Sequence, residues 1–165
     1  MDEKKAINFR VLHVITGLNT GGAEMMLYKL LTGLDPKVFK SEVVSLMDIG
    51  PVGLKIRNMG VQVSSLGMKR GVPNPLGILR LAGRIREYRP HCIQTWMYHA
   101  DLVGGLAAKL AGSIPVVWGI RHSSLEPQST RRTTLWTARA CALLSRRVPA
   151  SIVCCSDASR RAHTE

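Results

Sequence analysis

Short apolar runs rich in β-branched residues alternate along the chain with longer segments whose apolar residues recur every three or four positions. The short runs are bounded by glycine, proline or charged residues and are typical of strands buried on both faces of a parallel sheet. The longer segments have the period of amphipathic helices. The pattern predicts strands over 9–16, 38–46, 61–66, 91–96, 115–120 and 151–155, and helices over 22–34, 52–59, 76–88, 101–110 and about 129–147.

Regular alternation of strand and helix predicts an α/β fold with a Rossmann-like, doubly wound parallel sheet and right-handed crossovers. The chain has 165 residues, which suffices for one compact domain and not for two full α/β domains. No internal repeat or low-complexity tract competes with this interpretation. We therefore expect a single domain over residues 1–165.

The first predicted strand leads into a glycine turn, Thr20-Gly21-Gly22-Ala23-Glu24, which opens the first helix. Backbone N–H groups and the positive end of a helix meet at such a turn, which suits phosphate or another anion. The spacing matches neither the G-x-G-x-x-G dinucleotide fingerprint nor a P-loop, which argues against a generic NAD or ATP site. Alternatively, Gly21 and Gly22 only allow close packing of helix on strand, and Glu24 is a favourable charge at the helix end.

Polar residues follow the fourth and fifth predicted strands, where ligands bind in open α/β sheets. Tyr98 and His99 follow one strand, and Arg121, His122 and Ser123 follow the other. His122 is the better catalytic candidate, because Arg121 beside it disfavours a core position and imidazole can donate a hydrogen bond near neutral pH. His99 could equally bond the backbone of the helix that we expect to begin near Asp101.

Other chemistry has no signature in the chain. His13 lies inside the first predicted strand, where we expect a hydrogen-bonded core histidine. The four cysteines form no C-x-x-C pair, and no histidines have zinc-finger spacing, so we expect no metal site and small buried thiols. Hydrolase motifs and a clear carboxylate pair are also lacking.

The charge favours an anionic partner. Lys and Arg number 23 against 11 Asp and Glu, a net charge of +12 that leaves nucleic acid, anionic membrane and phosphorylated substrate open. Arg132, Arg139 and Arg146 recur every seven residues and share one helix face. That face is either simply solvated or suited to the anionic inner leaflet of a membrane. Aromatic residues are not interleaved with the basic ones, which argues against nucleic acid as the partner.

No signal peptide or membrane span is visible in the sequence. We therefore expect a reducing, cytoplasmic location, with peripheral attachment to the inner membrane face as an option.

Four motifs resemble the N-terminal domain of glycosyltransferase family 4, whose members are retaining enzymes of the GT-B type that act in cell-surface polysaccharide and glycoconjugate synthesis. In order they are VLHVITGLNTGGAE, IQTWMYHADLVGGLAAKLAG, IPVVWGIRHSS and SIVCCSDASRRAH. The resemblance covers nearly the whole chain. It implies one half of a GT-B fold, in which this domain binds a glycan or lipid-linked acceptor and a second domain binds the nucleotide-sugar donor.

The resemblance also implies roles for individual residues. Gly21 and Gly22 would face the donor diphosphate or sugar, His122 would contact the transferred sugar, and no cofactor or metal is needed. We expect Tyr98, His99, Arg121 and Ser123 to line the acceptor cleft.

The donor-binding domain of the family would follow Glu165 and is not among these residues. We expect the chain alone to be inactive and to bind nucleotide-sugar weakly, because leaving-group stabilisation is a large part of transfer chemistry. The alternative is a non-catalytic binding module, or one subunit of a split glycosyltransferase whose donor domain is a separate polypeptide. A basic nucleic-acid-binding module ranks third.

Overall fold

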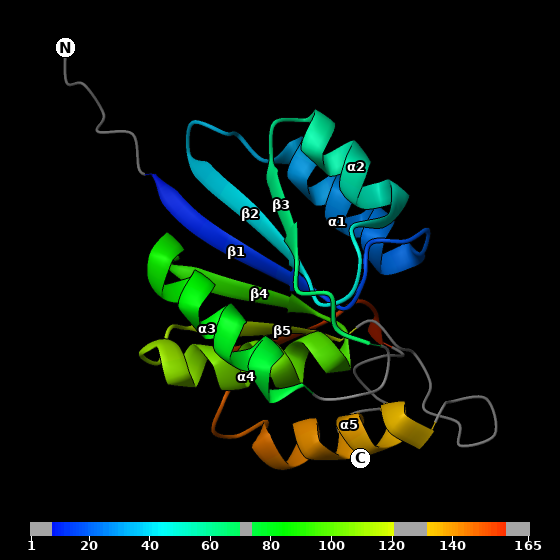
Figure 1. The fold of residues 1–165 in the computed structure, drawn as a ribbon, viewed down its shortest axis with the longest axis vertical. Coiled ribbons are helices and arrows are strands. Elements are labelled where there is room, and N and C mark those ends of the chain that lie inside the picture. The colour runs from blue at the N-terminus through cyan, green and yellow to red at the C-terminus, as the bar shows by residue number, and fades with distance from the viewer. Residues whose placement is uncertain (1–7, 70–73, 121–131, 158–165) are drawn as a thin grey trace.

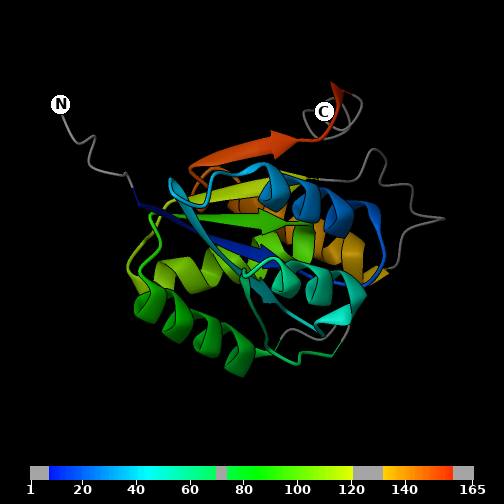
Figure 2. The same ribbon diagram turned by 90° about the horizontal axis from the view of Figure 1, so that it is seen from above.

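Six parallel strands form one sheet with helices on both faces, as Figures 1 and 2 show. The computed structural model describes residues 8–69, 74–120 and 132–157. The strands are β1 (Phe9–Ile15), β2 (Phe39–Ser45), β3 (Gln62–Ser65), β4 (Cys92–Trp96), β5 (Val116–Ile120) and β6 (Ser151–Cys154). The helices are α1 (Gly22–Gly33), α2 (Gly50–Asn58), α3 (Pro75–Tyr88), α4 (Tyr98–Ala111) and α5 (Arg132–Leu144).

The predicted α/β class and the predicted alternation of elements are confirmed. Two helix ends differ from the prediction by three residues: α4 begins at Tyr98 instead of near Asp101, and α5 ends at Leu144 instead of Arg147. Met97 precedes α4 with a positive φ of 74° and offers no side-chain cap. Since no Ser, Thr, Asp or Asn marks this start, the usual capping signal is missing from the sequence.

The strand order β3-β2-β1-β4-β5-β6 places β1 and β4 side by side at the centre of the sheet. After β1, strands β2 and β3 extend the sheet to one edge. Strand β4 then pairs with the other side of β1, and β5 and β6 complete the second half of the sheet. In the register of this sheet Ile15 lies opposite both Ser45 and Trp96. The loops after β1 and β4 therefore emerge next to each other at the carboxyl edge, the usual ligand position in such sheets.

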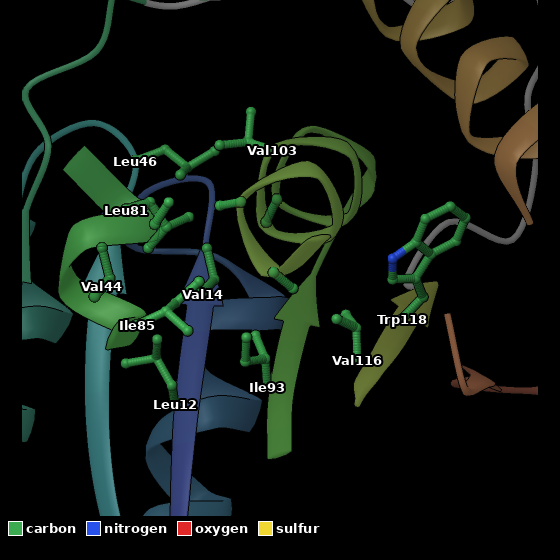
Figure 3. Close-up of a cluster of buried hydrophobic side chains, with 14 of the residues drawn as sticks. Leu12, Val14, Val44, Leu46, Leu81, Ile85, Ile93, Val103, Val116 and Trp118 are labelled. Atoms are coloured by element: carbon green, nitrogen blue, oxygen red, sulfur yellow. The ribbon is translucent and has the colours of Figure 1, made fainter. Parts of the chain in front are cut away.

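Two apolar cores hold the layers together. Alternate residues of β1 point to opposite faces, so Leu12 and Val14 pack with Leu81 and Val103 of α3 and α4 (Figure 3). Ile15 packs on the other face with residues of α1 and α2, among them Leu27 and Ile56. Most of β1 is buried on both faces, which accounts for its nearly continuous apolar sequence.

Among the helices of the described residues, none combines the length and apolar character required to cross a bilayer.

Candidate functional site

The glycine turn lies at the carboxyl edge of the sheet, where β1 passes into α1. Gly21 is the N-cap of α1 in an extended conformation, and its carbonyl accepts a hydrogen bond from Met25 N–H at 3.0 Å. Gly22 is exposed, and a Cβ atom placed on it would meet no atom within 4 Å. The backbone therefore does not require glycine at Gly22, and the missing side chain leaves the first turn of α1 open to an approaching group.

The residues before this turn are anchored to α2 and the loop after β2. Leu18 is fully buried and its carbonyl accepts a hydrogen bond from Val52 N–H at 3.0 Å. The Asn19 amide donates to the Asp48 carboxylate at 3.2 Å. Gly50 has a φ of +53° and its Cβ position is taken by the Leu18 carbonyl, so glycine is required there. This packing fixes the path of the turn.

Glu24 modifies the electrostatics of the turn. It is the acidic residue of the first turn of α1, as predicted, and its carboxylate occupies the space beside Gly21 where a Cβ atom would stand. A carboxylate at the positive helix end is stabilising. It also offsets that positive end, so the turn is a weaker site for a free anion than the glycine pattern alone indicates.

Met97, at the end of β4, has an unusual backbone conformation. Its φ of 74° and ψ of 154° fall in a region that is almost restricted to glycine. Its N–H donates to the Gly119 carbonyl of β5 at 3.1 Å, and its carbonyl accepts from Asp101 N–H at 2.9 Å. The neighbouring strand and helix thus hold Met97 in place, at the point where the chain turns into the candidate residues Tyr98 and His99.

Tyr98 and His99 are the first two residues of α4. Tyr98 was expected to line an acceptor cleft, but its side chain is 3% exposed and belongs to the larger core cluster. Burial, with smaller contributions from Asp101 and two nearby thiols, raises the pKa of the Tyr98 phenol. Its carbonyl accepts a hydrogen bond from the Cys141 thiol of α5 at 3.4 Å. His99 is half-buried at the edge itself.

Arg121, His122 and Ser123 lie outside the described residues, so the structure gives no position for them. They follow Ile120, the last residue of β5, which is next to β4 at the same edge of the sheet.

Asp101 is a buried acid that sequence analysis did not single out. Its side chain is fully buried in the first turn of α4, where Oδ1 lies 2.5 Å from the Thr95 hydroxyl. Burial raises the pKa of Asp101 to about 7, against the opposing effect of hydrogen bonds from Thr95 and the Gly119 backbone. The signal that could have found it is a carboxylate among the small apolar residues of that helix, such as Ala100 and Val103.

His13 is 1% exposed on the face of the sheet that α1 and α2 cover, which confirms the predicted core position. Its ring centroid is 6.3 Å from that of Trp96. Neither ring nitrogen has a hydrogen-bond partner within the described part of the chain, so the expectation of a hydrogen-bonded histidine was wrong. Burial lowers the pKa of His13 to about 4, because the charged imidazolium would lose its hydration there.

Possible metal ligands and cysteine thiols form no metal site within residues 8–69, 74–120 and 132–157 of the structure. No group of three or more His, Cys, Asp or Glu in these ranges is placed to hold a metal ion. Cys141 is buried as expected, whereas Cys155 is exposed.

Comparison with known proteins identifies a family and similar solved structures. The model of Glycosyltransferase Family 4 matches residues 20–165. Crystal structures of HepE from Anabaena in complex with UDP and with UDP-glucose are similar to this chain with a TM-score of 0.73 at 21% sequence identity. A third HepE structure, with UDP and glucose, has a TM-score of 0.74. A search of curated proteins found no significant match.

The similarity to HepE covers 94% of this chain and 40% of the HepE chain, so the chain spans about 40% of the length of the structures that it matches. At this level of identity the likeness shows the fold alone.

Proposed function

The chain belongs to glycosyltransferase family 4, and we propose that it is the acceptor-binding half of a retaining glycosyltransferase. The complete enzyme would transfer a sugar from a nucleotide-sugar to a glycan or lipid-linked acceptor in cell-surface polysaccharide synthesis. The observation that carries the proposal is the open first turn of α1 beside the exit of β4, at the carboxyl edge of a family 4 domain. A ligand held there would contact backbone N–H groups directly.

In this proposal, Gly21 and Gly22 form one wall of a cleft and face the donor diphosphate. His122 contacts the transferred sugar while the acceptor hydroxyl attacks its anomeric carbon. His99, Arg121 and Ser123 line the acceptor side. Tyr98 contributes its backbone and the packing that fixes the start of α4, because its ring lies in the core.

The donor half lies outside these 165 residues in our proposal. The groups that stabilise the departing nucleoside diphosphate belong to that half, and such electrostatic stabilisation is commonly the largest contribution to catalysis. The 165 residues alone should therefore neither transfer sugar nor hold a nucleotide-sugar tightly.

The test is a sugar-transfer assay on the chain joined to a donor half, with folding measured separately by urea unfolding. Loss of one charge-assisted hydrogen bond in His122→Ala should lower transfer by about 10- to 100-fold. The control is His91→Ala, because His91 lies just before β4, at the opposite edge of the sheet. A well-folded His122→Ala variant with near-wild-type transfer contradicts the role of His122, and transfer by the chain alone contradicts the proposal as a whole.

A second candidate is one subunit of a split transferase, or a binding module without catalysis. It rests on the same family 4 match over residues 20–165, which a donor domain on another polypeptide would complete. It requires a separate donor-domain polypeptide that forms a stable complex with this chain. Size-exclusion chromatography of the two purified polypeptides tests it, and failure to co-elute excludes the split enzyme.

A further inference from the structure

Helix α5 has an inner face that packs on the domain and an outer face that nothing in the described structure covers. Ala138, Cys141 and Leu144 pack in or against the larger core cluster. Trp136 and Leu143 lie seven residues apart on another face and are 69% and 84% exposed. Figure 1 shows α5 as the outermost helix of its layer, below α4. These are the two most exposed large apolar side chains of the described residues.

Arginines are interspersed with these two apolar side chains. The Arg139 guanidinium stands 5.8 Å from the centre of the Trp136 ring, and Arg146 and Arg147 are exposed in the turn after α5. Residues 132–147 contain four arginines and no Asp or Glu. The outer face of α5 and this turn therefore carry only positive charge.

Two of the three arginines of α3, Arg84 and Arg86, behave differently. Arg84 forms ion pairs with Glu42 at 3.2 Å and Glu87 at 3.4 Å, and Arg86 donates to the Leu110 carbonyl. Among the described residues, no ion pair engages Arg139, Arg146 or Arg147. These three side chains are therefore available to an external anionic partner.

Exposed apolar side chains also occur on the two other helices of this layer. Helices α3, α4 and α5 cover the same face of the sheet and contact one another in sequence. Leu76 and Leu79 of α3 and Leu110 of α4 are each at least 50% exposed. An extended layer with scattered apolar groups suits a broad partner surface better than a narrow peptide groove.

The chemistry of the outer face favours a lipid surface. Tryptophan rings prefer the headgroup region, leucine enters the acyl boundary, and arginine reaches lipid phosphates while its stem stays in apolar surroundings. A nucleic acid would pair with the arginines but would leave Leu143 in water. The charge complements an anionic leaflet and not a neutral one.

We propose that the outer face of α5 docks on an anionic membrane surface. Trp136 and Leu143 enter the headgroup region, and Arg139, Arg146 and Arg147 contact lipid phosphates. The proposal does not depend on sugar transfer, so vesicle binding tests it separately from the proposed function. For a lipid-linked acceptor, docking would hold the acceptor edge of the sheet near its substrate.

The experiment is co-sedimentation of the 165-residue chain with vesicles of phosphatidylcholine alone or mixed with phosphatidylglycerol. Binding should require phosphatidylglycerol and weaken with added salt. Trp96 and Trp118 are 1% and 2% exposed, so acrylamide quenching of the folded chain reports mainly on Trp136. On anionic vesicles this quenching should fall and the emission should shift to the blue.

Two variants separate apolar insertion from charge. The double substitution Trp136→Ser with Leu143→Ser should weaken binding by at least about tenfold. The triple substitution of Arg139, Arg146 and Arg147 by Gln should weaken it by about tenfold or more. The control is Leu54→Ser on α2, which is 55% exposed on the other side of the sheet and should bind like wild type.

Three results would overturn the proposal: no binding to anionic vesicles, equal binding to neutral vesicles, or wild-type binding by the Trp136→Ser and Leu143→Ser double variant. If a partner protein covered this face instead, the first of these results would be obtained. Urea unfolding checks that each variant folds, which we expect because the substituted side chains are exposed.

Discussion

Oδ1 of Asp101 lies 2.5 Å from the hydroxyl of Thr95, and the same hydroxyl lies 3.2 Å from the Val117 carbonyl. Thr95 has one proton and cannot donate fully to both oxygens. When Asp101 is protonated it can donate to Thr95, which leaves Thr95 free to donate to Val117. This arrangement agrees with the burial that raises the pKa of Asp101 to about 7. His13, on the other face of the sheet, is buried with a lowered pKa.

His13→Leu should remove a loss of stability at acid pH. Burial lowers the pKa of His13 from 6.5 to about 4, so the unfolded chain takes up a proton between these values and the folded chain does not. Above pH 6.5 the burial of neutral His13 therefore does not lower the free energy of unfolding of the wild type. That free energy falls as the pH is lowered towards 4. Relative to wild type, the variant should gain about 3 kcal/mol between pH 7 and pH 4. Urea unfolding at a series of pH values measures the difference in free energy of unfolding between the variant and the wild type. A difference that does not change with pH would contradict the prediction.

Asp101→Asn should show the opposite trend. The raised pKa means that the folded state holds a proton between 3.8 and about 7 that the unfolded state has released. The contribution of Asp101 is therefore greatest at low pH and is lost as the pH rises through about 7. Compared with wild type, the variant should become less stable as the pH is lowered from 8 to 4. Urea unfolding at the same pH values measures this change. A variant that gains stability relative to wild type as the pH is lowered would exclude a buried neutral acid at Asp101.

Substitutions at Met97 should reveal backbone strain. Met97→Gly and Met97→Ala both remove the side chain, but only glycine accepts a φ of 74° with a ψ of 154° without strain. The glycine variant should be more stable than the alanine variant by about 1 kcal/mol. Met26 is the matched control, because it is exposed within α1, where alanine should exceed glycine by about 1 kcal/mol. If the glycine and alanine variants had the same order of stability at Met97 and Met26, backbone strain at Met97 would be contradicted.

Gly22→Leu should impair sugar transfer without harming the fold. Gly22 and Gly33 lie at the two ends of α1, and an added Cβ atom meets nothing within 4 Å at either position. Both leucine variants should be at least as stable as wild type, with a gain of up to about 1 kcal/mol. With a donor half present, Gly22→Leu should lower transfer at least about tenfold and Gly33→Leu should leave it unchanged. Equal transfer by both variants would show that the turn does not face the donor.

Hydrophobic periodicity predicted the fold well because the pattern that identifies each strand and helix lies within its own residues. Apolar β-branched runs predicted all six strands, and the helical period predicted the five helices. The start of α4 was missed because Met97 turns the chain through an unusual conformation held by Gly119 of β5, a contact between segments far apart in sequence. No local residue preference carries that information.

The candidate site was predictable only in part. The glycine turn and the loop after β4 could be placed at the carboxyl edge from the order of elements alone. The burial of Tyr98 could not, since it depends on α5 packing over the start of α4 through Cys141. The buried Asp101 and the unpartnered nitrogens of His13 likewise depend on which helices cover each face, which sequence spacing does not fix.

The central claim, that this domain supplies only the acceptor side of the cleft, is tested most directly by calorimetric titration of the 165-residue chain with UDP-glucose. Near-ultraviolet circular dichroism of the buried Trp96 and Trp118 verifies that the titrated chain is folded. The account predicts weak binding or none, because the groups that hold the nucleotide belong to the donor half. A tight one-to-one complex would contradict it and would show that a complete nucleotide-sugar site lies within these residues.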